Sequence, residues 1–514
     1  MLTSLLGIGS FTIVDSNIVT EEDLGVNFFL DESQIGHPRG ESLRNMLCEL
    51  NPDVTGHWAE TLGEMSKYDL FIWTAPSADL LTRKRLEGYC AAVQKPLITI
   101  NSQGFYAYFH IRFNGDFPIV ETHPEETALR DLRVLNPWPE LEEWAEGLTK
   151  GLEKQSNHKH GHIPWLALMI YYINRWREQN KAEDGTPIPF TGTFKQKKEV
   201  QTLIQSGQRY DNGEGGEENY DQAFANVMKT VRQATLSEKV KEIFDLCDQE
   251  GYRNSKDTFW HLARALKKFH EKNERLPIAG FVPDMKAESE VYVQLQNLYK
   301  AQSRKDIEEI KSFINPAILA KPGTEDEIST FCKNAESLHL IRHSDIPRDS
   351  DLEREVYCTW ARAGIEGEKI EKETVAATNE ERSAEIEAGN AMAVVPKPPL
   401  EYILLALRSM DTRDLKDMMD IEQDTISGAI EDLLTEPKAY IQGWHALQVG
   451  KSEAMKQVVK EVWRGKGGEL HNTASLVGGL VSQEVIKLLT RQYVPVENLV
   501  VWDGIFCRMG TFKA

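Results

Sequence analysis

The chain has 514 residues, so it is too long for one ordinary hydrophobic core. Its hydrophobic fraction of 41% and charged fraction of 27% are those of a folded globular protein. The formal net charge of -21 argues against general affinity for nucleic acid, because phosphate binding depends on clustered Lys and Arg. We therefore expect several domain-sized units, a protein partner and no nucleic acid.

The sequence also argues against a membrane or secreted protein. The most apolar stretch, residues 163–172, gives way to Asn174 and Arg175 and falls short of the roughly 20 apolar residues that span a bilayer. It predicts a core helix with Pro164 in its first turn. The N-terminus lacks the basic region of a signal peptide. Six scattered Cys without a CxxC motif favour reduced thiols and no structural zinc. We expect a cytoplasmic and nuclear protein.

The first part of the chain alternates between strand-like and helical segments. Short apolar runs rich in Ile and Val predict strands at residues 11–15, 69–75 and 96–102. Between the first two, residues 40–50 carry apolar side chains at helical spacing. Such alternation predicts a largely parallel sheet.

The middle of the chain is almost entirely helical in period. A polar linker, QSNHKHG, precedes it. In residues 259–273, apolar side chains recur on one face, as expected for a helix in a bundle. Two segments look mobile: an acidic, Gly-rich loop near 211–219, which lacks the Lys-Ser or Lys-Thr of a phosphate loop, and the charge-dense segment 366–398.

Regular α/β signals return near the C-terminus. Residues 470–489 predict a helix in which Gly478 and Gly479 would let another backbone approach closely. Two strand-like pieces follow, at residues 498–504 and 506–512.

The simplest organisation is one α/β domain closed from both chain ends, with a large helical insertion. We place the N-terminal part of the α/β domain at residues 1–150 and the insertion at 151–460. The C-terminal part then covers residues 461–514.

Gly7 and Gly9 form a GxG motif, but a nucleotide fingerprint runs from strand to glycine loop to helix. Here the glycines precede a strand, which favours a tight turn. Asp15, at the end of that strand, is placed where an acidic residue can bind a ribose in doubly wound folds. It is also a common starter of turns, and without a phosphate loop we favour that reading.

The candidate nucleophiles and metal ligands are weak. Cys358 is followed by Thr359 but lies in a continuous helical pattern, and the thiols of Cys48, Cys90 and Cys332 lie in apolar helical patterns. The alternating histidines of NHKHGH could bind a metal, but a solvated linker fits them better; they are His158, His160 and His162.

Several segments together resemble one family. GIGSFTIVDSNIVTEEDLGVNFFL is similar to the adenylation domain of the ubiquitin-like modifier activating enzymes. FWHLARALKKF, LPIAGFVPDM and TASLVGGLVSQEVIKLL resemble the regulatory subunits of its heterodimeric neddylation-activating branch. The likeness runs from Gly7 to the C-terminus and is weakest between Lys300 and Lys460.

The resemblance implies a Rossmann-like, adenylation-type α/β domain that pairs with a catalytic subunit. In such enzymes that partner binds ATP and Mg²⁺ and adenylates the C-terminus of the ubiquitin-like modifier. It then holds the modifier as a thioester before transfer to a conjugating enzyme. This chain is expected to bind no cofactor or metal and to contribute no catalytic residue.

The chain departs from the active members at positions that serve the nucleotide. Where they read S-N-L-N-R-Q-F, Val26 replaces an asparagine, Asn27 the arginine and Phe28 the glutamine, so with Asp15 we expect a degenerate site. Cys358 lacks the proline-preceded loop of the family's nucleophile.

The family also begins with a βα unit ahead of the equivalent of Gly7, and residues 1–6 resemble only the tail of its helix. Either the protein is a genuine short form or its start codon is misplaced, and we favour the second; as the sequence stands, the sheet is expected to lack a central strand. Two alternatives remain: a self-sufficient ATP-dependent adenylating enzyme, and a helical protein-interaction adaptor.

Overall fold

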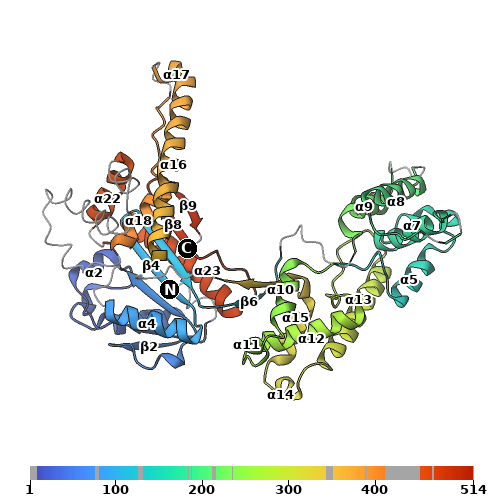
Figure 1. The fold of residues 1–514 in the computed structure, drawn as a ribbon, viewed down its shortest axis with the longest axis horizontal. Helices are drawn as coiled ribbons and strands as arrows, with labels where there is room; N and C mark the ends of the chain where they lie inside the picture. Colours follow the sequence, from blue (N-terminus) through green and yellow to red (C-terminus); the bar gives the residue numbers. More distant parts are fainter. Residues whose placement is uncertain are drawn as a thin grey trace. The chain divides into compact units, whose positions relative to one another are not determined.

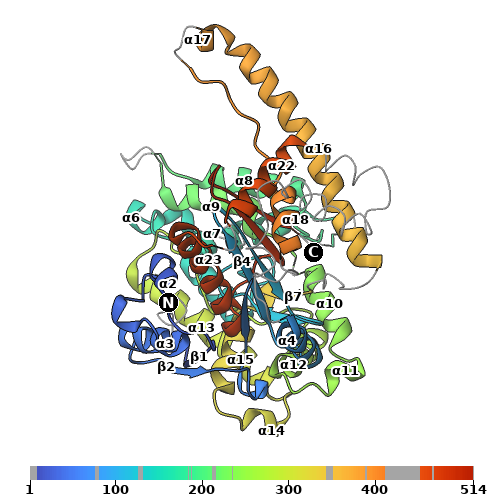
Figure 2. The same ribbon diagram turned by 90° about the vertical axis from the view of Figure 1, so that its left-hand side faces the viewer.

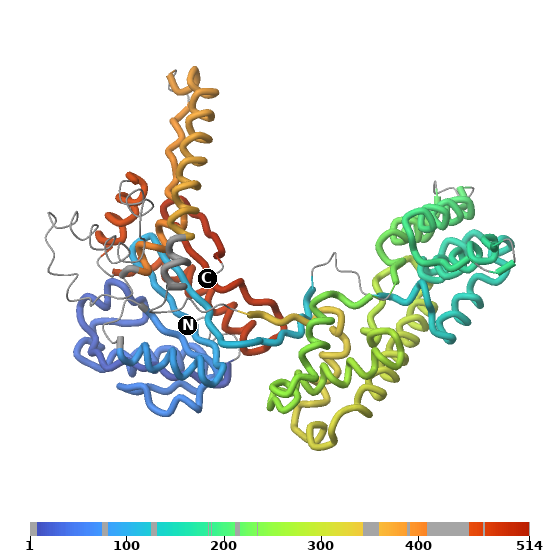
Figure 3. The backbone as a smooth tube through the Cα atoms, in the orientation of Figure 1, coloured from blue at the N-terminus to red at the C-terminus, as the bar shows by residue number. Residues whose placement is uncertain are grey.

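The computed structural model describes residues 8–75, 80–124, 131–182, 185–186, 188–210, 216–233, 235–342, 351–387, 391–410, 452–465 and 468–512. The chain forms two compact units. The first combines residues 1–117 with 341–514, and the second is the insertion 118–340. Figure 3 traces the chain out of the first unit, through the helical insertion and back again.

The predicted α/β unit is present, and its sheet is mixed. Its strands are β1 (Ser10–Val14), β2 (Thr55–Ala59), β3 (Phe71–Ala75), β4 (Leu97–Gln103), β5 (Tyr106–Arg112), β8 (Leu499–Asp503) and β9 (Arg508–Phe512). The pairs β1–β2 and β3–β4 are parallel, whereas β5 pairs antiparallel with β4 and β8, and β8 pairs antiparallel with β9. The expectation of a largely parallel sheet is therefore wrong for its second half. The cause is the tight turn at Gly104 (φ +56°), which returns the chain as a hairpin.

The sheet is divided into two pieces, β2-β1 and β3-β4-β5-β8-β9. In the doubly wound order 3-2-1-4-5, β2 and β1 take the third and second places and β3 takes the fourth. Within the described residues the first place between them is unfilled, as the resemblance implied. Val14 and Ile72, on the two strands that border it, are 42% and 43% exposed.

Helices lie on both faces of this sheet. The helices of this unit are α2 (Glu21–Val26), α3 (Arg39–Leu50), α4 (Leu80–Val93), α16 (Asp351–Glu381), α17 (Ser383–Glu387), α18 (Leu400–Met410), α22 (Glu453–Gly465) and α23 (His471–Thr490). Tyr106, Tyr108, Leu499 and Val501 share one sheet face with apolar residues of α16, α18 and α22. Figure 2 shows α23 on the other side of the strands from α16 and α18.

The helices after residue 351 correct two predictions. They pack on the sheet, so the insertion ends at Leu340 rather than at residue 460. The segment 366–398, predicted to be mobile, is helical to residue 387. It is fixed where Asn379 Nδ2 donates to Val394 O (3.0 Å) and Val394 N donates to Asn379 Oδ1 (2.7 Å). Its charged surface reflects a helix that extends away from the core, as Figure 2 shows.

The inserted unit is built from helices. They are α5 (Pro139–Thr149), α6 (Asn157–His160), α7 (Trp165–Gln179), α8 (Phe194–Gly207), α9 (Glu218–Thr230), α10 (Glu238–Leu246), α11 (Glu250–Arg253), α12 (Thr258–Asn273), α13 (Ser289–Lys311), α14 (Pro316–Leu319) and α15 (Thr324–Lys333). Two short paired strands, β6 (Phe117–Val120) and β7 (Leu338–Ile341), lie where the chain passes between the units. Figure 1 labels most of these elements.

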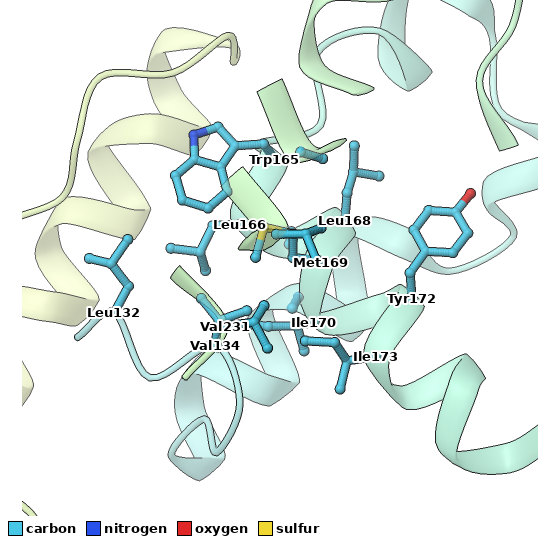
Figure 4. Close-up of a cluster of buried hydrophobic side chains, with 14 of the residues drawn as sticks. Leu132, Val134, Trp165, Leu166, Leu168, Met169, Ile170, Tyr172, Ile173 and Val231 are labelled. Carbon is cyan, nitrogen blue, oxygen red and sulfur yellow. The ribbon is translucent and has the colours of Figure 1, made fainter. Parts of the chain in front are cut away.

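The predicted core helix is the centre of this unit. Figure 4 shows residues of α7 packed with Leu132, Val134 and Val231 in one apolar cluster. Pro164 lies at the N-cap of α7, one residue before the predicted first turn. Because α5 packs into the same cluster through Leu141, the insertion begins at Pro118 rather than at residue 151.

Two other predictions fall partly outside the described residues. Of the acidic loop near 211–219, residues 211–215 lie outside them, and residues 218–219 open α9. The predicted close approach at the glycine pair is wrong for Gly478, where a Cβ would meet nothing within 4 Å.

Candidate functional site

The degenerate nucleotide position lies at the carboxyl end of β1, where α2, α3 and β2 meet it. Asp15 follows the strand, its N–H donates to Ala59 O (3.0 Å), and Trp58 Nε1 donates to its backbone oxygen (2.9 Å). The helix α3 approaches closely, because a Cβ at Gly40 would lie 2.4 Å from the Trp58 ring. Only glycine fits there, and the arrangement fixes the start of α3 beside Asp15.

Arg39, the first residue of α3, joins two carboxylates at this corner. Its Nε donates to Asp15 Oδ2 over 2.7 Å, and its Nη1 donates to Asp23 Oδ1 over 2.8 Å. Asp23 Oδ2 also accepts from Thr20 N (2.8 Å) and Thr20 Oγ1 (2.9 Å). The Asp15 carboxylate is thus bound by a guanidinium of its own chain, at the position where an acidic residue would meet a ribose.

The electrostatics favour the charged forms of this cluster. Burial opposes ionisation of Asp23, but its hydrogen bonds with Thr20 and its pairing with Arg39 outweigh burial and lower its pKa. Burial likewise disfavours the Arg39 cation, yet the bonds to Asp15 and Asp23 raise the pKa of Arg39. The three groups therefore form a self-sufficient ion cluster.

The three substituted positions follow directly on α2. Val26 ends the helix and is 40% exposed. Asn27 serves the local turn, since its N–H donates to Asp23 O (2.8 Å) and its Oδ1 accepts from Phe29 N (3.1 Å). Phe28 is 85% exposed and its ring meets that of Phe29 edge to face at 5.7 Å. None of the three carries a cation, and the side-chain oxygen of Asn27 is already used in the turn.

These residues do not fit ATP or Mg²⁺. A nucleotide phosphate needs unpaired N–H groups or cations, and Mg²⁺ needs available oxygen ligands. At this corner the guanidinium of Arg39 is shared by two carboxylates, and the side-chain oxygen of Asn27 is held in a turn. In the part of the chain that the structure describes, no group of three or more His, Cys, Asp or Glu residues is arranged for a metal ion.

The GxG motif contributes little to this corner. Gly9 has no positive φ, and a Cβ there would meet nothing within 4 Å, so its backbone does not require glycine. Gly7 and the predicted helix tail at residues 1–6 lie outside the described residues.

The buried thiols are poor nucleophiles. Burial raises the pKa of Cys90 and Cys247 to about 11 and that of Cys332 to about 12, which disfavours the thiolate. Cys48 and Cys507 are free thiols as well. The side chain of Cys358 lies outside the described set.

The histidine tract divides into a buried member and two outer ones. His160, expected to be solvated, is buried: its Nδ1 lies 2.7 Å from Glu217 Oε1 and its Nε2 lies 2.9 Å from the Tyr220 hydroxyl. His158 and His162 stack at 4.3 Å nearer the surface. His160 is buried because α9 and its N-cap place Tyr220 and Glu217 against the linker. The sequence around His160 gives no indication of these distant partners.

Sequence reasoning missed Arg39 and Asp23, the two residues that close the corner. Arg39 lies 24 residues from Asp15, and its position depends on the path of the chain between β1 and α3. Asp23 lies within the segment GIGSFTIVDSNIVTEEDLGVNFFL that carries the resemblance, but no local pattern there indicates its pairing with Arg39.

A protein-family model and several curated proteins match the chain over nearly all of its length. The model described as the ThiF family matches residues 1–514. The NEDD8-activating enzyme E1 regulatory subunit of Xenopus laevis is 29% identical over 532 residues, covering 99% of this chain and 91% of that protein. The Nedd8-activating enzyme E1 regulatory subunit of Drosophila melanogaster is 28% identical, with coverages of 99% and 89%. The regulatory subunit AXR1 of Arabidopsis thaliana is 27% identical, with coverages of 97% and 87%.

The similar solved structures match a smaller part. Crystal structures of E. coli MccB, one with MccA-N7isoASN and one with ATP, are each 17% identical and cover 22% of this chain with TM-scores of 0.20. They cover 36% and 37% of those chains. Among the described residues, no helix has the length and apolar character required to cross a membrane.

Proposed function

The chain belongs to the ThiF family, and from this premise we propose that it is the regulatory, non-catalytic subunit of a heterodimeric NEDD8-activating enzyme E1. The similarity to the regulatory subunits of Xenopus laevis and Drosophila melanogaster spans 99% of the chain. A match of this extent includes the helical insertion as well as the sheet. It therefore goes beyond a shared nucleotide-binding fold.

One observation carries the non-catalytic part of the proposal. The carboxylate of Asp15 is occupied by Arg39, which also binds Asp23. The positions that would add a cation and two amides hold Val26, Asn27 and Phe28 instead. A developing phosphoryl charge would find no stabilising group at this corner.

In the proposed complex the catalytic partner performs the chemistry. It binds ATP and Mg²⁺, adenylates the C-terminus of the ubiquitin-like modifier, and holds the modifier as a thioester until transfer to a conjugating enzyme. This chain contributes no cofactor ligand and completes the pair of adenylation-type domains. We place the complex in the cytoplasm and nucleus.

Reconstitution tests the proposal. This chain, a NEDD8-activating catalytic subunit, and the two together are assayed for pyrophosphate exchange with ATP and NEDD8, after size-exclusion chromatography of the mixture. We expect co-elution of the two chains and exchange by the pair, with none by this chain alone above a reaction without enzyme.

A matched control separates the contributions of the two chains. A catalytic subunit whose acceptor cysteine is replaced by alanine should, when paired with this chain, retain exchange and lose the thioester. Exchange by this chain alone would establish the self-sufficient enzyme instead. A chain that remains monomeric beside the catalytic subunit would refute the heterodimer.

A further inference from the structure

A cavity of about 140 Å³ lies within the helical unit. It is lined by residues distant in sequence from the cluster of Asp15, Asp23 and Arg39, here called the nucleotide corner. Its apolar lining, Val240 and Leu276, belongs to the core of α10, α12 and α15. Its ionisable lining comes from α12 and from segments outside the α-helices, and includes Asp131, Arg133, Arg232, His270, Arg275 and Glu336. Cationic side chains from three separate segments thus meet at one cavity.

Arg133 is the innermost of these cations. Its neighbours Leu132 and Val134 pack into the apolar cluster of Figure 4, whereas Arg133 lines the cavity. Its side chain is only 8% exposed, with Nη1 donating to Asp131 Oδ2 (2.8 Å) and Nη2 donating to Leu276 O (2.5 Å). Its Nε is buried and has no hydrogen-bond partner among the described residues. A buried donor of this kind is costly unless something accepts from it.

Arg232 and Arg275 add two further guanidinium groups, and α10 adds its N-terminus. Arg232 follows α9 directly, and Arg275 follows α12 and also pairs with Asp306. Ser237, the N-cap of α10, lines the cavity and accepts from Val240 N, which leaves its hydroxyl proton available to donate. The positive end of a helix favours a negative ligand.

The carboxylates of the lining are already engaged. Asp131 accepts from Arg133 N and Nη1, both at 2.8 Å, and Glu336 accepts from Asp131 N and Arg232 Nη2, both at 3.2 Å. With Asp306 on Arg275, each of the three guanidinium groups already has a carboxylate partner, and the donor that remains unused within the described residues is Nε of Arg133. Burial lowers the pKa of Arg133; Asp131 opposes this effect and Arg275 adds to it.

We propose that this cavity binds a phosphate-type oxyanion, either inorganic phosphate or the phosphate of a small phosphomonoester, with Arg133 Nε as its innermost donor. Planar guanidinium groups match the geometry of phosphate oxygens. The cavity of about 140 Å³ far exceeds the roughly 10–15 Å³ needed to hold one water, so it has room for a polyatomic ion. The ligand supplies the missing acceptor for Nε of Arg133.

Calorimetric titration of the full chain tests the site, with inorganic phosphate in one arm and AMP in the other at constant ionic strength. We expect saturable binding by the unmodified chain. Arg232→Gln, at a side chain 46% exposed, should fold normally and weaken binding about tenfold, since it removes one charge-assisted donor. Arg133→Lys keeps the charge but removes Nε, and should weaken binding at least as much.

Arg304→Gln is the matched control, because Arg304 is exposed on α13 and does not line the cavity. It should bind as the unmodified chain does. Equal affinity for the two ligands identifies the bare oxyanion, and tighter binding of AMP identifies a phosphomonoester; each supports the site. The proposal would be overturned if binding were not saturable, or if titration with chloride gave the same heats as titration with phosphate. It would also be overturned if Arg232→Gln bound with the same affinity as the unmodified chain. That last result decides the matter even if Arg133→Lys fails to fold.

Discussion

Two arginine clusters in this protein use the same chemistry to different ends. At the nucleotide corner, Arg39 is shared by Asp15 and Asp23, and the cluster is complete. In the helical unit, the cavity keeps an unpartnered donor, Nε of Arg133, beside the guanidinium groups of Arg232 and Arg275. The comparison shows that an arginine cluster indicates a ligand-binding site only where a hydrogen-bond donor remains without a partner. Charges that are fully paired within the chain stabilise the fold and have no donor left for a ligand.

The deepest carboxylate near the cavity provides the largest expected effect. Asp306 is 1% exposed and accepts from Arg275 Nη1 and Nη2, each at 2.7 Å, and from Ile278 N at 2.9 Å. Asp306→Ala leaves Arg275 without its carboxylate, and we expect the free energy of unfolding to fall by about 3–5 kcal/mol. Chemical denaturation of the full chain measures this loss.

Lys305→Ala is the matched control on the adjacent residue. Lys305 pairs with Glu140 at 2.6 Å, but the two side chains are 61% and 49% exposed. Its loss should cost less than about 1 kcal/mol because solvent screens such pairs. Equal losses for the two variants would mean that Asp306 is not the buried anchor that the geometry indicates.

The corner should respond less strongly than Asp306. Arg39→Ala removes the donor to both Asp15 and Asp23, and we expect a local loss of about 1–3 kcal/mol, since both are hydrogen bonds to charged groups. The stability of Arg39→Lys should lie between that of the unmodified chain and that of Arg39→Ala, because lysine keeps the charge but lacks the planar guanidinium. Amide hydrogen exchange in β1 and α2 measures the local stability. Unchanged exchange in Arg39→Ala would show that the pairing does not hold these elements together.

The sheet shows which elements the sequence could predict. The strands β1, β3, β4, β8 and β9 were predicted because each is a short apolar or alternating run beside turn residues. The strand β5 was missed, although all but its last residue is buried. Its direction depends on the hairpin at Gly104, and alternation of strands and helices gave a false expectation of parallel pairing there.

The helical segments show the complementary limit. Helical spacing predicts a buried face but does not say which core that face joins, so α16, α18 and α22 were assigned to the insertion although they pack on β5 and β8. The candidate site had the same limit. Asp15 and residues 26–28 were found by resemblance, whereas Arg39 and the burial of His160 depend on partners 24 and 57 residues away.

Acidification should change the folding stability contributed by Asp23 and by Glu336 in opposite directions. This is the smallest of the expected effects. The pKa of Asp23 is lowered from 3.8, so its stabilisation is complete above 3.8 and is lost as the pH falls through the lower, folded-state value. Burial raises the pKa of Glu336 above 4.5, although Arg232 opposes this. The folded state then takes up that proton first, so acidification through the raised value favours folding at the cavity.

Neutral variants test this difference in sign. Asp23→Asn should destabilise the chain at neutral pH, and the difference from the unmodified chain should vanish in acid. Glu336→Gln should lessen the cost of a buried charge at neutral pH, and that advantage should shrink as the pH falls. Both changes should stay under about 1 kcal/mol, because at each carboxyl the hydrogen bonds and the paired arginine oppose the effect of burial. Glu290→Gln, at an exposed acid of α13, is the control. Urea denaturation across the acid range measures all three, and shifts of the same sign for Asp23 and Glu336 would contradict the contrast between a carboxylate stabilised by its partners and one destabilised by burial.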